Sequence, residues 1–388
     1  MKASNKKLLF SVSLLLLCIF AAGFYSIQEY EASRKSEVMI FSEQSLSEKE
    51  DLKVEIINEA NDQLLDDKKE EVLLEKDAEQ LSVNEESEKT DTGEAAADKH
   101  QEKFSILPAP VKKKDDSDTL RIGLMTDLHV QSESGEGVLL SEYYTKKINY
   151  FVEKMNNVFS PNFILLNGDV IEGTRTSSEI GSKELSLLKN LFDRTIIKKY
   201  WVAGNHDLRS VNKKQWMKAL KIDYMSESFD VGNYKIIILD GNFTREDVAI
   251  GPGIDYTRGK VSQKQVDWLR RELEKTDKKA IVFMHYPPLR DINAKTNLGL
   301  LYNAKELQDI FSQYGILAVF SGHIEDLYYQ EIGGVDYFVS PGMVKYPKYL
   351  GAFSEITIKG KKVTITLDYL MGDGKYRTIK IEKNAGKT

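Results

Sequence analysis

Cysteine is almost absent: the 388 residues include one, Cys18, which lies in an apolar run near the N-terminus. A single cysteine excludes a disulfide within the chain and leaves no thiolate metal site. Any bound metal must therefore be held by oxygen and nitrogen ligands. The residue also makes a poor lipoprotein signal, because Leu17 stands where a small residue would be needed.

Aromatic residues are absent from Ser42 to Glu102, where Glu, Asp, Lys, Ser and Asn dominate. Such a segment cannot bury enough apolar area to offset the cost of ordering its backbone. We predict an acidic low-complexity linker or stalk over residues 29–118, closed by Pro108 and Pro110. Its few apolar positions could form a short helix or a weak coiled coil.

One long apolar run is present, the 18 residues from Leu8 to Tyr25, and three lysines precede it. Basic residues on this side favour an N-terminus that stays in the cytoplasm. The length is near the lower limit for a membrane-spanning helix, while Ala21 and Gly23 suit a signal peptidase. Residues 1–28 are therefore expected to be a signal peptide or a membrane anchor. The rest of the chain would lie outside the cytoplasm, either attached to the membrane or secreted.

Residues 119–370 alternate short apolar runs with amphipathic segments, which is typical of an α/β domain. The expected strands are Leu120–Met125, Phe163–Leu166, Tyr200–Ala203, Lys235–Leu239, Ala280–Met284 and Leu317–Phe320. The expected helices are Tyr143–Phe159, Lys183–Phe192, Ser262–Glu274 and Ala304–Tyr314. From Tyr337 to Tyr369 a period of two, with a turn at Gly360–Lys361, predicts antiparallel strands. Residues 371–388 are expected to be a C-terminal tail.

Polar residues follow five of these strands directly. The five blocks are Asp127-Leu128-His129, Gly168-Asp169, Gly204-Asn205-His206-Asp207, His285, and Gly322-His323-Ile324-Glu325. Ligands of α/β sheets bind at the carboxyl ends of strands, so the blocks should converge on one edge. Four of the chain's five histidines fall there, and the fifth, His100, lies in the expected linker.

These residue types suit two divalent cations. Imidazole binds zinc, iron and manganese, while carboxylate and amide oxygens suit manganese and magnesium. The two oxygens of one carboxylate, such as Asp169, can bridge two metals. A single histidine at a strand end is more often structural than a ligand, but five successive strand ends form a pattern that chance does not readily produce.

In order and spacing, the five blocks resemble the calcineurin-like metallophosphoesterase superfamily from about Leu120 to about Tyr369. The resemblance implies an α/β fold with a two-sheet β-sandwich flanked by helices and a dinuclear site at the strand ends. It implies that the first metal is bound by Asp127 and His129, and that Asp169 bridges. The second metal would be bound by Asn205, His285 and His323. The helix containing Trp268 and Leu269 also resembles the cyclic-nucleotide-phosphodiesterase-like branch.

The resemblance also implies an acid for the leaving group. His206 would protonate the leaving oxygen, and Asp207 would orient its ring. Two metals can activate a water and neutralise the phosphate, while general acid catalysis contributes roughly 10²–10⁴-fold. We therefore expect a metal-dependent hydrolase of phosphomonoesters or phosphodiesters. No nucleic-acid or protein partner is inferred.

Two positions depart from the family pattern. Glu325 stands where the family usually has a histidine that binds the first metal, and a carboxylate there would favour manganese among Mn, Fe, Zn and Mg. It could instead weaken that metal, and the alternative is a binding domain with little or no catalytic activity. Glu172 stands where the purple acid phosphatases need a tyrosine, which excludes that branch.

The substrate is not evident from the sequence. Six loop residues are candidate phosphate contacts, although solvation explains them equally well: Arg245, Tyr256, Arg258, Lys260, Arg290 and Lys295.

Overall fold

The computed structural model describes residues 52–57, 118–132, 140–174, 176–254, 258–289, 301–344, 350–370 and 376–384. The predicted N-terminal apolar segment lies outside these residues. Among the residues described, no helix has the length and apolar character needed to cross a membrane.

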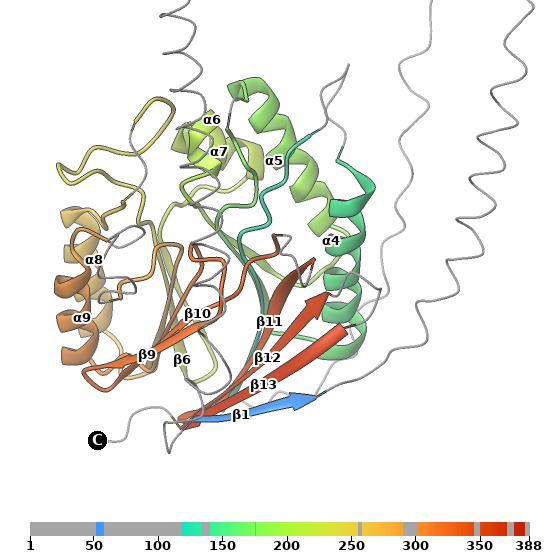
Figure 1. Ribbon diagram of the computed structural model, residues 1–388. Helices are drawn as coiled ribbons and strands as arrows, with labels where there is room; N and C mark the ends of the chain where they lie inside the picture. Colours follow the sequence, from blue (N-terminus) through green and yellow to red (C-terminus); the bar gives the residue numbers. More distant parts are fainter. Residues whose placement is uncertain are drawn as a thin grey trace, which may run out of the picture. The chain divides into compact units, whose positions relative to one another are not determined.

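Two mixed β-sheets form the framework (Figure 1). The seven-stranded sheet has the order β1 (Leu52–Ile57), β13 (Tyr376–Asn384), β12 (Lys362–Leu370), β11 (Gly351–Lys359), β2 (Thr119–Met125), β3 (Phe163–Asn167) and β4 (Lys199–Val202). The six-stranded sheet has the order β5 (Glu227–Val231), β6 (Tyr234–Leu239), β7 (Lys279–Met284), β8 (Ala318–Ser321), β10 (Val335–Val339) and β9 (Tyr328–Ile332). Strands β2 to β4 are parallel, as are β6, β7, β8 and β10.

Helices cover the outer faces of both sheets (Figure 1). Over the seven-stranded sheet lie α4 (Glu142–Lys154), which continues as a π-helical turn (Met155–Phe159), α5 (Ser178–Phe192), α6 (Asp207–Ser210) and α7 (Lys213–Leu220). Over the six-stranded sheet lie α8 (Gln263–Glu274) and α9 (Ala304–Gln313). The period of two in the strands explains this layering. Ile164 and Leu166 pack under the helices, while Phe163 faces Phe283 of the other sheet with 6.3 Å between ring centroids.

The expected fold class is confirmed, since two mixed sheets are flanked by helices. Several elements were missed or misplaced. β10, expected to be antiparallel, pairs antiparallel with β9 but also parallel with β8. β13 lies in the expected tail and pairs antiparallel with β12, and β1 lies in the expected spacer and pairs antiparallel with β13. Lysine and glutamate alternate with apolar residues in both strands, and β1 is distant in sequence from its partner β13. The domain boundaries stay predictions.

Candidate active site

The strand ends that carry the predicted ligands meet at one edge. The Asp127 main-chain N–H donates to the Gly168 carbonyl at 2.9 Å, which joins the ends of β2 and β3. The His323 N–H donates to the Asp127 carboxylate at 3.0 Å, so the β8 end reaches across from the other sheet. His285, after β7, places its Nδ1 2.9 Å from the Asn167 carbonyl oxygen. Both sheets therefore contribute to one site.

The side chains form three overlapping groups, and within each group the metal-ligating atoms lie within 4.8 Å of one another. One group contains Asp127, His129 and Asp169, and another contains Asp169, His285 and His323. Asp169 belongs to both groups. The third group contains His129, Glu172 and His206.

Unusual backbone conformations position these groups. Eight non-glycine residues among those described have positive φ, and five of them belong to the predicted ligand set: Asp127, His129, Asp169, His323 and Glu325. Each such conformation costs about 1–3 kcal/mol, and surrounding structure must enforce it. Part of that enforcement is close packing. A Cβ added to Gly204 would lie 2.1 Å from the Asp169 Oδ1, so only glycine admits the carboxylate here.

His285 is completely buried and already oriented to accept a cation. Because Nδ1 donates to the Asn167 carbonyl, Nε2 is the nitrogen that would bind a cation on losing its proton, and it lies 3.1 Å from Asp169 Oδ2 and 3.2 Å from Asn205 Oδ1. Metal-binding histidines are commonly fixed by such a bond from the other ring nitrogen. Burial acts to lower the pKa of His285, but Asp169 and Asp127 outweigh it and raise that pKa to about 9. The site attracts positive charge strongly.

His129 shows the same arrangement with a carboxylate as its anchor. Its Nδ1 lies 2.9 Å from Glu172 Oε2, and its buried Nε2 has no hydrogen-bond partner among the described residues. Around Nε2 lie Asp127 Oδ1 and Asp169 Oδ2, both at 3.9 Å, and Glu325 Oε1 at 3.3 Å. Burial opposes a rise in the pKa of His129, yet the carboxylates raise it well above its usual range. An orphaned nitrogen among three carboxylates fits a divalent cation.

The remaining predicted ligands lie beside these two histidines. The Asn205 amide oxygen faces His285, and the His323 ring lies 5.2 Å from the His285 ring, centroid to centroid. Burial and the neighbouring His285 lower the pKa of His323 to about 3, so it stays a neutral donor. All seven predicted metal ligands are thus gathered at one place, and their roles stay predictions.

Glu172 is the functional candidate that the sequence analysis missed. Its Oε2 lies 2.9 Å from Nδ1 of both His129 and His206, and its Oε1 accepts a 2.8 Å hydrogen bond from Arg209. Burial alone would raise the pKa of Glu172, but the bonds from both histidines hold it well below its usual range. One ionised carboxylate therefore orients a predicted ligand and the predicted acid. Its only sequence signal is its position three residues after Asp169.

The role of Asp207 in orienting the His206 ring stays a prediction, and the hydrogen bonds of its carboxylate run to the main chain. The Asp207 carboxylate accepts main-chain hydrogen bonds from Gly204, Ile171 and Asp169 at 2.9, 3.0 and 3.1 Å. It therefore ties the loops after β3 and β4 together, and Glu172 makes the contact to the His206 ring. Burial, together with the nearby Asp169, raises the pKa of Asp207 to about 7.

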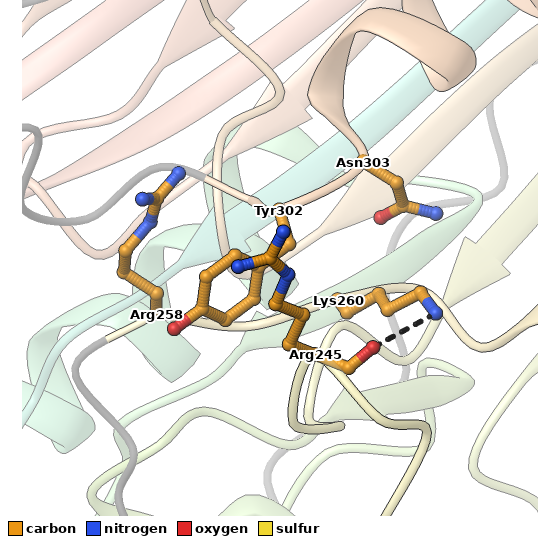
Figure 2. A pocket seen from close by; sticks show the side chains of 5 residues that line it. All are labelled: Arg245, Arg258, Lys260, Tyr302 and Asn303. Atoms are coloured by element: carbon orange, nitrogen blue, oxygen red, sulfur yellow. Dashed lines mark hydrogen bonds between the residues drawn. The ribbon is translucent and has the colours of Figure 1, made fainter.

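Of the predicted phosphate contacts, Arg245, Arg258 and Lys260 line a pocket of about 420 Å³ with Tyr302 and Asn303 (Figure 2). Tyr256, Arg290 and Lys295 lie outside the described residues.

Residues 120–324 match the family model of the calcineurin-like phosphoesterases. The chain is 30% identical over 216 residues to serine/threonine-protein phosphatase CPPED1 of Rattus norvegicus, covering 52% of this chain and 62% of that protein. It is 24% identical over 245 residues to a probable cyclic nucleotide phosphodiesterase of Pseudoalteromonas sp., covering 61% and 83%. A solved structure of a dimetal phosphatase from Danio rerio matches with a TM-score of 0.53 at 14% identity, covering 67% of this chain and 98% of that one. This structural likeness shows the fold alone, and the chain spans less than two thirds of the rat protein.

Proposed function

The chain belongs to the calcineurin-like phosphoesterase family, and on that basis we propose that it hydrolyses phosphoric esters with two divalent metal ions. The observation that carries the proposal is the position of Asp169, which belongs to both ligand groups. Its Oδ2 lies 3.9 Å from Nε2 of His129 and 3.1 Å from Nε2 of His285. Each imidazole presents the nitrogen that a metal needs.

The ligand set would hold the two ions through Asp169. The first would be held by Asp127, His129 and Glu325, and the second by Asn205, His285 and His323. When bound, two such ions activate water and neutralise the charge of the phosphate. Because carboxylates dominate the first set, we propose manganese as its favoured metal.

His206 would deliver the proton to the leaving oxygen. Glu172 holds its Nδ1, which leaves Nε2 as the nitrogen that gives up the proton. The Arg209 guanidinium, which has only donors, lies against this Nε2. A nitrogen that accepts from a guanidinium carries no proton, so Nε2 would have to part from Arg209 and take up a proton from solvent before it could act as the acid.

Metal analysis together with turnover tests the proposal. The purified full chain should bind close to two divalent ions and hydrolyse a nitrophenyl phosphate monoester or diester. Full metal content with no turnover of any ester would instead favour the alternative, a binding domain in which Glu325 in place of the usual histidine leaves little or no catalytic activity. The absence of bound metal would refute both.

For the location, we propose attachment to, or secretion across, a membrane. Support comes from the composition of residues 1–28, where three lysines precede the apolar run. Protease added to intact cells with a permeable wall should cut between Ser42 and Glu102, detected on denaturing gels. Complete protection would place the domain inside.

A further inference from the structure

A basic pocket lies on the loops that follow β6 and precede α9. It holds about 420 Å³ and is lined by Arg245, Arg258, Lys260, Tyr302 and Asn303. Figure 2 shows the two arginines gathered near the ring of Tyr302, with Lys260 and Asn303 alongside. Three of the five lining residues are cationic and none is acidic. This basic pocket is a different feature from the carboxylate-rich centre.

Contacts within the pocket fix its shape. The Arg258 guanidinium lies over the Tyr302 ring, 4.5 Å from the centroid. Both ends of the Asn303 amide pair with the main chain of Val261, at 2.9 and 3.2 Å. The Lys260 Nζ donates to the Arg245 carbonyl at 3.2 Å. The cationic groups are therefore held near one another in spite of their mutual repulsion.

The positive charge of the pocket is incompletely neutralised. Lys260 pairs with Asp247 at 2.8 Å. The Arg245 side chain is exposed, and within the described part of the chain its guanidinium has no ion-pair partner. Guanidinium groups bind phosphate oxygens through paired N–H donors and retain their charge at any physiological pH. A phosphate group is the ligand that best matches this lining.

The pocket is built against the metal-ligand loops at two points. Gly259, beside Arg258 and Lys260, packs so closely on Tyr286 that an added Cβ would lie 2.7 Å from the ring. The same ring lies 4.5 Å from the His323 ring, centroid to centroid. At the second point, Asn242 donates to the Ala203 carbonyl at 2.7 Å, two residues before Asn205. One aromatic ring thus separates the wall of the pocket from a predicted metal ligand.

We propose that the basic pocket binds a second phosphate group of the substrate while the scissile phosphate occupies the dinuclear centre. The preferred substrates would then be phosphate esters with another phosphate at the far end. The substrate assignment rests on the proposed hydrolase function, whereas the anion site does not. Tyr302, with the Arg258 guanidinium over its ring, would form one wall for the bound group.

Binding of inorganic phosphate to the metal-loaded full chain tests the site itself. Calorimetry should find two classes of site, one lost on chelation of the metal and one lost in the double variant Arg245→Gln, Arg258→Gln. Removal of two charge-assisted bonds should weaken the second class roughly 10- to 100-fold. Lys183→Gln, an exposed charge on α5, is the matched control and should change neither class. A double variant that binds phosphate like the parent overturns the proposal. If the hydrolase proposal is wrong, only the class of site that is sensitive to chelation should be missing, and the class at the basic pocket should still be found.

Kinetics test whether the phosphate bound by the basic pocket is part of the substrate. A series of linear diols, each as the monophosphate and the bisphosphate, should show one chain length at which the bisphosphate has a roughly 10- to 100-fold lower KM. The double variant should abolish that advantage by raising the KM of the bisphosphate to that of the matching monophosphate. If no bisphosphate is preferred, or if both ester types suffer equally in the variant, the second phosphate is not part of the substrate.

Discussion

The two ends of the candidate centre differ in chemistry although Asp169 joins them. The His129 end, formed by Asp127, His129 and Glu325, has two carboxylates for one imidazole, and Glu325 keeps 19% of its side chain exposed. The His285 end, formed by Asn205, His285 and His323, has two imidazoles and an amide, and His285 is fully buried. Oxygen-rich, wetter sites suit manganese or magnesium, and nitrogen-rich sites suit zinc or iron. The fold therefore gathers two unlike groups of candidate metal ligands at one edge.

The largest effect is expected at Asp169, the carboxylate that belongs to both ends of the centre. Asp169→Asn should lose most of both metals, and turnover should fall by roughly 10³-fold or more, the worth of several kcal/mol of charge stabilisation. Metal analysis and turnover of a nitrophenyl ester measure this, with the exposed Asp309→Asn on α9 as the control. Retention of both metals would show that Asp169 does not bridge.

Next in size is the loss of the acid, which belongs to neither end. His206→Ala should keep both metals and slow esters with basic alkoxide leaving groups by roughly 10²–10⁴-fold. Nitrophenolate leaving groups need little protonation, so their esters should be slowed much less. Glu172→Gln should show the same selectivity to a smaller degree, because it orients the ring. Equal slowing of both ester types, or loss of metal from His206→Ala, would make His206 a ligand instead.

Separate changes at each end sharpen the comparison. Loss of a residue that hydrogen-bonds to a metal ligand typically lowers metal affinity roughly 10- to 100-fold. His285→Ala removes a predicted ligand itself, so the metal affinity of the His285 end should fall by at least that factor. Glu325→His should leave activity intact or raise it, and should shift the metal preference of the His129 end towards zinc or iron. Competition binding between Mn²⁺ and Zn²⁺ reports this. An unchanged preference would mean that Glu325 is not a ligand.

The smallest effect for a single step of change, here one pH unit, concerns protons. The pKa of His285 is raised to about 9, so below pH 9 a metal must displace a proton from it. Apparent metal affinity should therefore rise by about tenfold per pH unit from pH 7 to pH 9, and then level off. Titrations of the metal-free chain at several pH values measure the slope, and His285→Ala should flatten it. A pH-independent affinity would contradict the protonated state.

The side chains of the predicted ligand set lie together because parallel strands deliver their carboxyl ends to a common edge. Asp127, Asp169 and His285 could be located from that rule alone. Glu172 and Arg209 could not, because their roles depend on contacts with ring nitrogens 34 and 3 residues away. The main-chain contacts of the Asp207 carboxylate could not be predicted either, because adjacency in sequence does not indicate which way a carboxylate turns.

The fold was predictable where apolar runs are strong and not where charges alternate. The buried strand Phe163–Asn167 is apolar at its first four positions and was identified readily. β13 has lysine or glutamate at alternate positions and was assigned to a tail. Its partner β1 precedes the domain by some sixty residues, so no local signal links the two.

The pairing of β1 with β13 brings a strand from the expected linker into the folded domain, so the fold includes residues far upstream of β2. A proteolytic cut anywhere between residues 58 and 117 would sever the backbone, yet the six residue pairs of β1 with β13 would still hold the two fragments together. A clipped molecule would run as two bands on a denaturing gel and as one species on a sizing column. Its release would follow the rate at which a six-residue strand detaches, and not the rate of cleavage. An expressed fragment starting at residue 119 would instead leave β13 as an open edge, which invites self-association.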